Sequence, residues 1–357
     1  MYSKREDVRS MLKRNGYKKA YPEFSTCPSL QQQLIETIGT DDFETYFDFA
    51  TSGIYAPGIP TASEEEFRTY YKNELKQGVY FDNYGVAHEP GSKEAAHMTR
   101  MIHPLKGLVS LDMIKNYPLP DYKEVDQANL VDKCNQIHNR KQFSTAHVQC
   151  SIWEQAWYLR SMEDLMADMM TDDEIAAVLL DRVTNTLIDG IEMYARAGVD
   201  SLFFGDDIGM QSTILMSVSL WETWLKPRLK KAIDAARAIN PDLIIFYHSC
   251  GYIEPFIDGL IECGVDVLNP IQTECMDFKE IHAKYGERIS FSGTIGTQTT
   301  MPFGTPDEVK KAVWTNLEIA GDKGGLLCCP THILEPEVPV ENVLAYVEAC
   351  KTFAIST

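Results

Sequence analysis

The chain has 357 residues, with 33 Lys and Arg against 52 Asp and Glu, which gives a net charge of −19. This charge disfavours nucleic acid and anionic membranes as partners, and a hydrophobic content of 44% excludes a disordered chain. The apolar runs are too short to span a membrane, and the N-terminus lacks the apolar core of a secretory signal. The nine scattered cysteines predict reduced thiols in a cytoplasmic protein.

The first 20 residues hold seven basic and two acidic side chains, so this segment differs in charge from the rest of the chain. Val8, Met11 and Leu12 share one side of a helix, which predicts an amphipathic helix with a solvated basic face. An interaction arm for an acidic partner is the alternative. Further along, Tyr80–Asp82 and Leu108–Val109 are weak strand candidates.

From about residue 145 the chain alternates between apolar runs of strand length and helical patterns. Six runs are expected to be strands: His147–Ile152, Ser201–Phe204, Leu243–Tyr247, Val265–Leu268, Ile289–Phe291 and Gly325–Cys329. They are continuous rather than alternating, as in parallel strands that are buried on both faces. One helix between these strands is expected to end at Gly198. The next is expected to begin at a capping box of Ser219 and Glu222 and to run to about Ile239. Three later helices are expected to begin at Asp277, Thr305 and Pro339.

This order predicts an α/β protein with a (β/α)8 barrel and an N-terminal, mostly helical extension. Residues 1–130 would form the extension, which caps the barrel mouth and could supply its first strands, and residues 131–357 would form most of the barrel. An open doubly wound sheet is the alternative. It is disfavoured because no glycine-rich phosphate loop follows any of the strands.

Polar and metal-binding side chains follow five consecutive predicted strands, where a parallel barrel places its chemistry. His248 and Cys250 are the most specific pair, because residues two apart on an extended segment point the same way and suit Zn²⁺. A buried histidine beside a small apolar cysteine is the alternative. A third donor would make an open catalytic zinc site, and three residues after the last strand qualify: Cys328, Cys329 and His332.

Three acidic residues near these strand ends are candidates for acid–base chemistry. Asp206 and Asp207 are adjacent, so only one of them can face a central site, and the other is expected to cap a helix or bind a loop. Glu274 could be a fourth metal ligand or a general base, with an exposed loop acid as the alternative. Gln211, Gln298 and Tyr247 are the polar residues expected to contact the substrate.

Several motifs together resemble the uroporphyrinogen decarboxylase superfamily from about Tyr80 to Thr352. The motifs are Phe81-Asp82-Asn83-Tyr84-Gly85, His103-Pro104-Leu105, Gly205-Asp206-Asp207 with Gln211, His248-Ser249-Cys250-Gly251, Gly293 to Gln298, and Pro339 to Val343. The arginine-rich N-terminal motif of the decarboxylases is missing. The His-x-Cys-Gly run is instead similar to that of the zinc-dependent, corrinoid-linked methyltransferases.

The resemblance to these methyltransferases implies a zinc ion at His248, Cys250 and a third ligand. Aligning Pro330 and the Pro339–Asn342 run with the family places His332 at the third position, and Cys329 is the alternative. The implied reaction moves a methyl group from a small donor, preferably a methyl ether, to cob(I)alamin on a corrinoid protein. Asp206, Asp207 or Glu274 could protonate the leaving oxygen. Methylation of a thiol such as coenzyme M, a metal-free decarboxylation, or a non-catalytic binding module are the alternatives.

Overall fold

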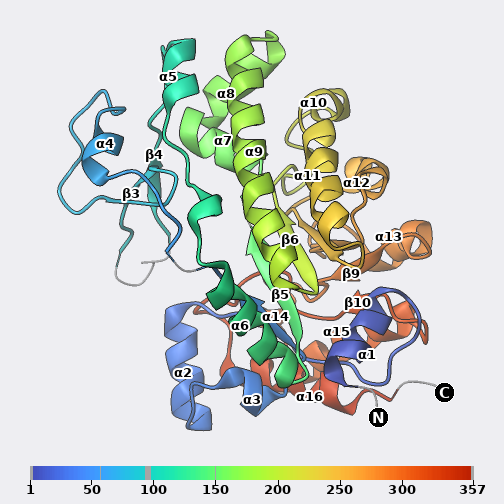
Figure 1. Cartoon of the computed structure of the whole chain (residues 1–357). Helices are drawn as coiled ribbons and strands as arrows, with labels where there is room; N and C mark the ends of the chain where they lie inside the picture. The colour runs from blue at the N-terminus through green and yellow to red at the C-terminus, as the bar shows by residue number, and fades with distance from the viewer. Residues whose placement is uncertain (1–2, 57, 93–97, 149, 355–357) are drawn as a thin grey trace.

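The computed structural model describes residues 3–56, 58–92, 98–148 and 150–354, which form an α/β fold around one curled parallel sheet (Figure 1). The sheet has seven strands that pair in the order of the chain. They are β1 (Thr51–Ile54), β5 (Phe143–Val148), β6 (Ser201–Gly205), β7 (Ile244–His248), β8 (Val267–Asn269), β9 (Ser290–Ser292) and β10 (Leu326–Leu327). Sequential parallel pairing is typical of a (β/α)8-type barrel and not of a doubly wound sheet, so the predicted fold class is confirmed.

An extended segment, residues 21–26, lies beside β10 at the end of the sheet. The Tyr346 hydroxyl accepts a hydrogen bond from the Glu23 N–H at 3.0 Å and is 3.1 Å from the Glu23 carbonyl and 2.9 Å from the Cys328 carbonyl. Thr26 also forms a parallel bridge with Leu334. The N-terminal segment is therefore anchored to Tyr346 and to the chain that follows β10.

Helices cover the outside of the sheet, as Figure 1 shows for α9 and α11. They are α6 (Gln127–Asn139), α7 (Trp153–Arg160), α8 (Met162–Met170), α9 (Glu174–Ala197), α10 (Val218–Trp224), α11 (Lys226–Ile239), α12 (Ile257–Cys263), α13 (Phe278–Tyr285), α14 (Thr300–Phe303), α15 (Pro306–Ala320) and α16 (Val340–Thr352), with the short 3-10 helices η1 (Tyr122–Glu124) and η2 (Glu254–Phe256). Among the described helices, none is long and apolar enough to cross a membrane.

The predicted helix boundaries agree with the structure at most places. Gly198 ends α9 in the left-handed conformation, Asp277 caps α13, and Thr305 forms a capping box with Glu308 at α15. The predicted helix from Ser219 to Ile239 is wrong in two respects. Ser217 is the cap, and the helix is broken at Leu225. The break follows from Pro227, which has no N–H to continue the α10 hydrogen bonds.

Two strand predictions are wrong in position. The strand expected at His147–Ile152 begins at Phe143 and is followed by α7, with Gln149 outside the described residues. Tyr80–Phe81 is a strand, β2, but it belongs to a separate antiparallel sheet with β3 (Ala87–Glu89) and β4 (Arg100–Ile102). Leu108–Val109 is not a strand. The first strand of the barrel is instead β1, whose short Thr-Ser-Gly-Ile sequence carries a weak apolar signal.

The N-terminal region contains α1 (Lys4–Leu12), α2 (Pro28–Ile38), α3 (Phe43–Phe47), α4 (Glu64–Arg68) and α5 (Leu111–Asn116). Val8, Met11 and Leu12 of α1 are buried, as predicted. This helix lies across the N-terminal ends of the strands, because the Met11 carbonyl accepts the N–H of Gly325 at 2.8 Å and the Leu12 carbonyl accepts the Ser290 hydroxyl at 2.7 Å. The division expected at residue 130 falls inside α6, and β1 comes from the N-terminal side of it.

Candidate active site

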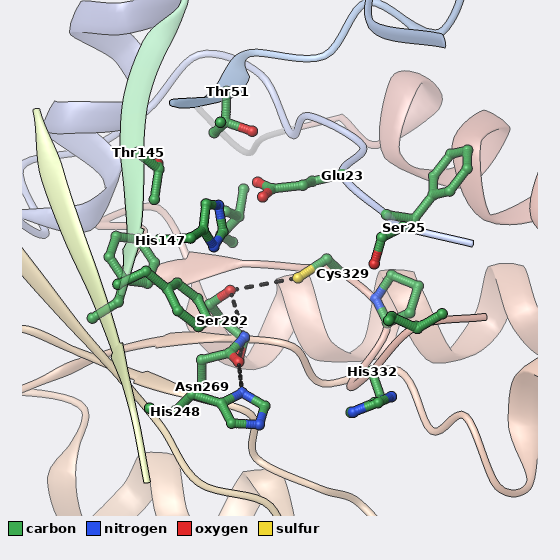
Figure 2. Close-up of a pocket in the computed structure, with 18 of the residues that line it drawn as sticks. Glu23, Ser25, Thr51, Thr145, His147, His248, Asn269, Ser292, Cys329 and His332 are labelled. Atoms are coloured by element: carbon green, nitrogen blue, oxygen red, sulfur yellow. Dashed lines mark hydrogen bonds between the residues drawn. The ribbon is translucent and has the colours of Figure 1, made fainter. Parts of the chain in front are cut away.

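Alternation along the strands points one set of side chains into a pocket of about 670 Å³ inside the curled sheet (Figure 2). Strands β1, β5, β6 and β7 each contribute residues two apart, and β8, β9 and β10 contribute one each. The residues are Thr51 and Gly53, Thr145 and His147, Phe203 and Gly205, Phe246 and His248, Asn269, Ser292, and Leu327 with Cys329 just beyond β10. The pocket therefore lies inside the barrel, and its chemistry comes from several strands at once.

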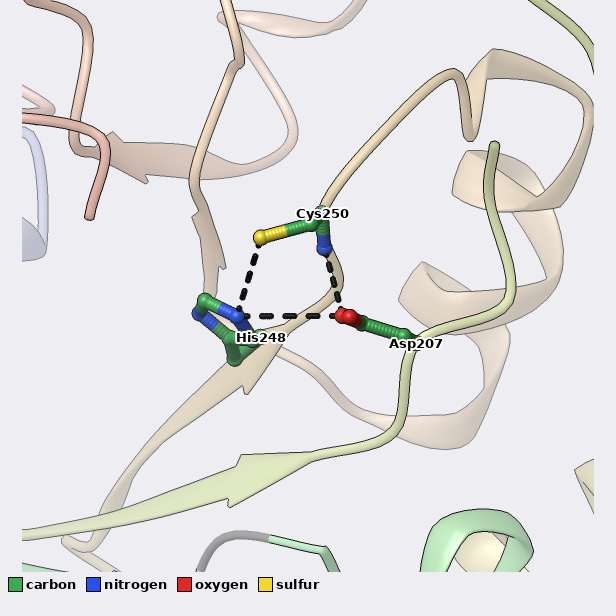
Figure 3. Close-up of side chains that lie close together, drawn as sticks. All are labelled: Asp207, His248 and Cys250. Carbon is green, nitrogen blue, oxygen red and sulfur yellow. Dashed lines mark hydrogen bonds and ion pairs between the residues drawn. The ribbon is translucent and has the colours of Figure 1, made fainter. Parts of the chain in front are cut away.

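Three potential metal ligands meet at the ends of β6 and β7 (Figure 3). The Cys250 Sγ lies 3.4 Å from the Nε2 of His248, and the Oδ1 of Asp207 lies 3.8 Å from the same nitrogen. The ligand atoms of these three residues all lie within 4.8 Å of one another. The predicted His248–Cys250 pair is thus brought together, and Asp207 is the third member of the group.

The His248 ring is held by Asn269 in an orientation that directs Nε2 toward Cys250 and Asp207. The Nδ2 of Asn269 lies 3.2 Å from both the carbonyl and the hydroxyl oxygen of Ser292, so the amide nitrogen donates on that side. Its Oδ1 then accepts the Nδ1–H of His248 at 2.7 Å. With the proton on Nδ1, the Nε2 lone pair points toward Cys250 and Asp207, which is the arrangement of a metal-binding histidine.

The backbone around Cys250 is fixed by close contacts with the loop after β6. Its N–H donates to the Oδ1 of Asp207 at 2.7 Å, and Tyr252 N–H donates to the Met210 carbonyl at 2.8 Å. Burial, with Asp207 and Glu154 nearby, raises the pKa of the Cys250 thiol. A cation bound at the site would reverse this effect, because it stabilises the thiolate.

The two residues proposed as the third ligand lie elsewhere around the pocket. His332 lines the pocket with its ring centre 6.4 Å from that of His248, and burial together with His248 lowers its pKa. Cys329 lies deeper, where its Sγ is 3.5 Å from the Ser292 hydroxyl. Neither belongs to the group of close ligand atoms found among the described residues, whereas Asp207 does.

Two predicted site residues face away from the pocket. Asp206 is buried and accepts the N–H groups of Ile152 and Glu154, at 3.0 and 2.9 Å, and the Ser151 hydroxyl at 2.9 Å. It therefore binds the start of α7, which is the helix-capping role expected for one member of the aspartate pair. Tyr247 is 1% exposed, and its hydroxyl is directed to the Asp206 carbonyl at 3.4 Å.

Gln211 and Gln298 meet at a second pocket of about 570 Å³, which shares Thr331, His332 and Ile333 with the first. The Nε2 of Gln211 lies 3.2 Å from the Oε1 of Gln298. Glu274 lines neither pocket. It accepts the Thr299 hydroxyl at 2.9 Å and the Gln298 N–H at 3.2 Å, so it supports the loop that carries Gln298.

Several residues that line the larger pocket inside the curled sheet (the main pocket) were not expected from the sequence. Glu154, near the start of α7, accepts the Tyr158 hydroxyl at 2.9 Å and the Asp207 N–H at 3.1 Å, and burial beside Asp206 and Asp207 raises its pKa to about 8. Glu23 and His147 also line the pocket. Glu23 carried no signal because it lies far from any predicted strand end, and His147 was placed at the start of its strand rather than near the end.

The charge of the pocket is one-sided. Its described lining contains four acidic residues, Glu23, Glu44, Glu154 and Asp207, and neither Lys nor Arg. Glu154, with its pKa raised to about 8, is mostly protonated near pH 7 and adds little to this charge. The described lining nevertheless lacks the basic side chains that a carboxylate or sulfonate ligand requires.

Comparison with known proteins identifies the class. The family model described as "Uroporphyrinogen decarboxylase (URO-D)" matches residues 95–353. The chain therefore belongs to the uroporphyrinogen decarboxylase family, and the predicted resemblance is confirmed at that level.

Individual relatives include both a methyltransferase and decarboxylases. A methylated-thiol–coenzyme M methyltransferase from Methanosarcina mazei is 24% identical over 204 residues, which are 55% of this chain and 50% of that protein. A uroporphyrinogen decarboxylase from Coxiella burnetii is 24% identical over 186 residues, or 51% and 48% of the two chains. The matches thus span about half the length of these relatives.

A solved structure supports the fold over the whole chain. The structure of a methyltransferase from Methanosarcina mazei has a TM-score of 0.68 with this chain, covers 98% of both chains and shares 17% identity. Because the two sequences share only 17% identity, this comparison shows that the two proteins have the same fold and nothing more.

Proposed function

We propose that this protein is a zinc-dependent methyltransferase that moves a methyl group from a small donor, preferably a methyl ether, to a cob(I)alamin carried by a corrinoid protein. The observation that carries the proposal is the His248–Cys250 pair at the end of β7, where His248 lines the barrel pocket, Cys250 lines the second pocket and Asn269 fixes the histidine tautomer. Among the relatives, the Methanosarcina mazei methyltransferase agrees with a methyl-transfer role.

The ligand residues fit a zinc ion. Imidazole and thiolate are preferred zinc ligands, and His248 and Cys250 present both from positions two residues apart at the end of β7. His332 is proposed as the third ligand, with Cys329 as the alternative, because the ring centre of His332 lies 6.4 Å from that of His248. Asp207 is a further candidate, since its carboxylate belongs to the close group of ligand atoms. A bound zinc ion would supply Lewis acidity at the leaving oxygen of the donor.

The chain's own residues would position the donor and manage the proton. The aromatic side chains of Phe203 and Phe246 form an apolar part of the pocket wall. Of the three acids proposed for proton transfer, Asp207 lies at the pocket, whereas Asp206 and Glu274 are bound elsewhere. In-line displacement also requires a path from solvent, and the lining residues Tyr55 and Ile333 are 63% and 38% exposed.

A decarboxylase that acts on a porphyrinogen is the weaker candidate. Such a substrate carries several carboxylates and requires basic side chains to bind them, whereas the described pocket lining has acids and lacks Lys and Arg. Methyl transfer to a thiol such as coenzyme M is the second candidate, favoured by the activity named for the Methanosarcina mazei relative.

A metal-binding and methyl-transfer experiment tests the proposal. Purified protein should contain about one zinc per chain, and Cys250→Ser should lose most of it while keeping its circular dichroism spectrum, because the barrel core does not depend on this site. Cys275→Ser is the matched control, since Cys275 is also partly exposed after a strand but is not in the ligand group.

The reaction is then measured with reduced cobalamin and a panel of methyl ethers, methylamines and methyl thioethers. Methylation of cobalamin by an ether, lost in His248→Ala, would support the proposal. Activity only from methylcobalamin to a thiol would assign the second candidate. Full zinc content in Cys250→Ser would contradict the proposed ligand set.

A further inference from the structure

Glu23 places a carboxylate inside the main pocket at a position that no described side chain neutralises. It belongs to the extended segment 21–26, whose backbone is anchored by the Tyr346 hydroxyl at 3.0 and 3.1 Å. Figure 2 shows its side chain directed toward the pocket near Thr51 and His147, across from His248 and Asn269. The anchored backbone holds this carboxylate on the side of the pocket opposite His248.

One oxygen of this carboxylate, Oε2, is shut off from solvent and has no hydrogen-bond partner among the described residues. Burial raises the pKa of Glu23, the Thr51 hydroxyl opposes this effect, and Glu44 adds to it. Thr51 is a partner for the other side of this group, so only Oε2 is left unsatisfied, and an unsatisfied buried oxygen destabilises the folded chain unless a ligand bonds to it. The last torsion of glutamate is soft, and a small rotation would present Oε2 to such a ligand.

The neighbours of Glu23 are polar but carry no positive charge. Thr51 and Thr145 bring hydroxyls from β1 and β5 into the same part of the pocket. His147 lies between the rings of Tyr55 and Phe203, with ring centres 5.6 and 5.0 Å away, and burial lowers its pKa to about 4. The histidine is therefore neutral near pH 7, and it offers one donor and one acceptor without compensating the carboxylate.

We infer that Glu23, His147, Thr51 and Thr145 form a substrate subsite that recognises an amine or ammonium group at the end of the methyl donor remote from the transferred methyl. The inference rests on the proposed function for the identity of the ligand as methyl donor. An ammonium satisfies the unpaired carboxylate and lies among the aromatic rings of Tyr55 and Phe203. The acids of the lining would in turn repel a donor that carries a carboxylate or sulfonate.

The test compares three methyl ethers of nearly the same shape: 3-methoxybenzylamine, 3-methoxybenzyl alcohol and 3-methoxybenzoate. Binding to the zinc-loaded full chain is measured by isothermal titration calorimetry, which does not require turnover. The amine should bind most tightly, the alcohol about 10-fold or more less tightly, and the benzoate most weakly, because only the amine forms a charge-assisted bond with Glu23.

Glu23→Gln removes the charge and keeps the shape of the side chain. We expect it to weaken binding of the amine by about 10- to 100-fold and binding of the alcohol by much less. Glu44→Gln is the matched comparison, because Glu44 lines the same pocket but already accepts from Ser52 at 2.9 Å and lies 3.4 Å from Arg140. Its effect on amine binding should be clearly smaller, which separates a direct contact from the general negative field.

The melting temperature of the unliganded Glu23→Gln protein is a second readout. Burial raises the pKa of Glu23 above its value in the unfolded chain, which costs stability at neutral pH, so removing the titrating group should raise the melting temperature. If Glu23→Gln does not fold, His147→Phe serves instead and should weaken binding of the amine by narrowing the same subsite. Benzoate binding as tight as that of the amine, or amine binding unchanged in Glu23→Gln, would overturn the inference.

The outcomes for the subsite and for the reaction are distinguishable. Tight, Glu23-dependent binding of the amine without methylation of cobalamin would keep the subsite and reject the proposed function. Methylation by all three ethers at equal rates, unaffected by Glu23→Gln, would keep the function and reject the subsite.

Discussion

Asn269 shows how a single amide determines the chemistry of a neighbouring ligand. Its Nδ2 faces two oxygen atoms of Ser292, so its Oδ1 must face His248. This fixes the proton on Nδ1 of the histidine and leaves Nε2 as the donor atom. The orientation of His248 thus depends on β8 and β9, although His248 itself lies on β7.

Asn269→Ala is therefore expected to weaken zinc binding about 10- to 100-fold while the chain remains folded. The affinity can be measured by competition with a chromogenic chelator. Ser292→Ala is a graded control, because the Asn269 amide would keep the carbonyl of residue 292, now 3.2 Å away, as an acceptor. This variant should therefore lose less zinc affinity than Asn269→Ala. Wild-type affinity in Asn269→Ala would show that His248 is not oriented in this way or does not bind the metal.

At the scale of elements, the site depends on how closely the loops after β6 and β7 pack. Gly251 has a φ of +84°, and a Cβ on it would lie 2.6 Å from the Met210 carbonyl oxygen. A Cβ on Gly209 would lie 2.6 Å from the Cys250 carbonyl oxygen and 2.9 Å from that of Tyr252. Both glycines are required because backbone meets backbone here, and this contact brings Asp207 next to Cys250.

Gly209→Ala should push the two loops apart, because neither carbonyl can move without moving its chain. We expect a loss of about 2 kcal/mol in the free energy of unfolding and about 10-fold weaker zinc binding. Urea unfolding and zinc titration measure the two effects.

Gly198→Ala is the control, since this glycine also has a positive φ, of +84°, but nothing lies within 4 Å of its added Cβ. It should cost about 1 kcal/mol in stability and leave zinc binding unchanged. Equal zinc affinity in both variants would contradict the role assigned to the loop contact.

At the scale of the whole molecule, α1 connects strands that are far apart in the sequence. Arg5 and Arg9 both pair with Asp200, which precedes β6 and has no solvent exposure, and the Arg5 Nε lies 2.9 Å from the carboxylate. His138 of α6 also faces Asp200, at 3.2 Å, and the N–H of Ser144 donates to it at 3.0 Å. Two of the seven basic residues of the N-terminal segment, Arg5 and Arg9, are thus paired within the protein.

This cluster predicts a pH-dependent contribution to stability. The bonds from Arg5 and Ser144 outweigh the effect of burial and lower the pKa of Asp200 below its value in the unfolded chain. Because the folded pKa is the lower one, the stabilisation is fully present above about pH 4 and is lost as the pH falls through the folded pKa.

Asp200→Asn should therefore reduce the free energy of unfolding by about 2 kcal/mol at neutral pH. This loss is smaller than the loss expected for a fully buried ion pair, because both guanidinium groups keep contact with water. The difference from the wild type should narrow below about pH 4. Urea unfolding curves at several pH values give the comparison. A difference that stays constant with pH would exclude the ionised carboxylate as the cause.

Several features follow from the sequence because they depend on local chemistry. The buried strands β6 to β10 are continuous apolar runs, and the caps at Asp277 and Thr305 and the stop at Gly198 lie where their side chains require. The early strands were harder to predict from the sequence. Strands β1 and β5 lack an apolar pattern, because they present Thr51, Gly53, Thr145 and His147 to a polar pocket. The assignment of Tyr247 to the substrate conflicts with that of His248, since adjacent strand residues face opposite sides.

The sequence by itself therefore determined the barrel class and the family, and it predicted the His-x-Cys pair at a strand end, because these features are set by spacing along one chain. Only the tertiary structure decided which donors converge on His248, which aspartate faces the pocket, and that Glu23 enters it from the N-terminal segment. The physical reason is that these contacts join residues from separate strands and loops. Their distances are set by how the sheet curls and how closely the loops pack, and neither is encoded in any one stretch of sequence.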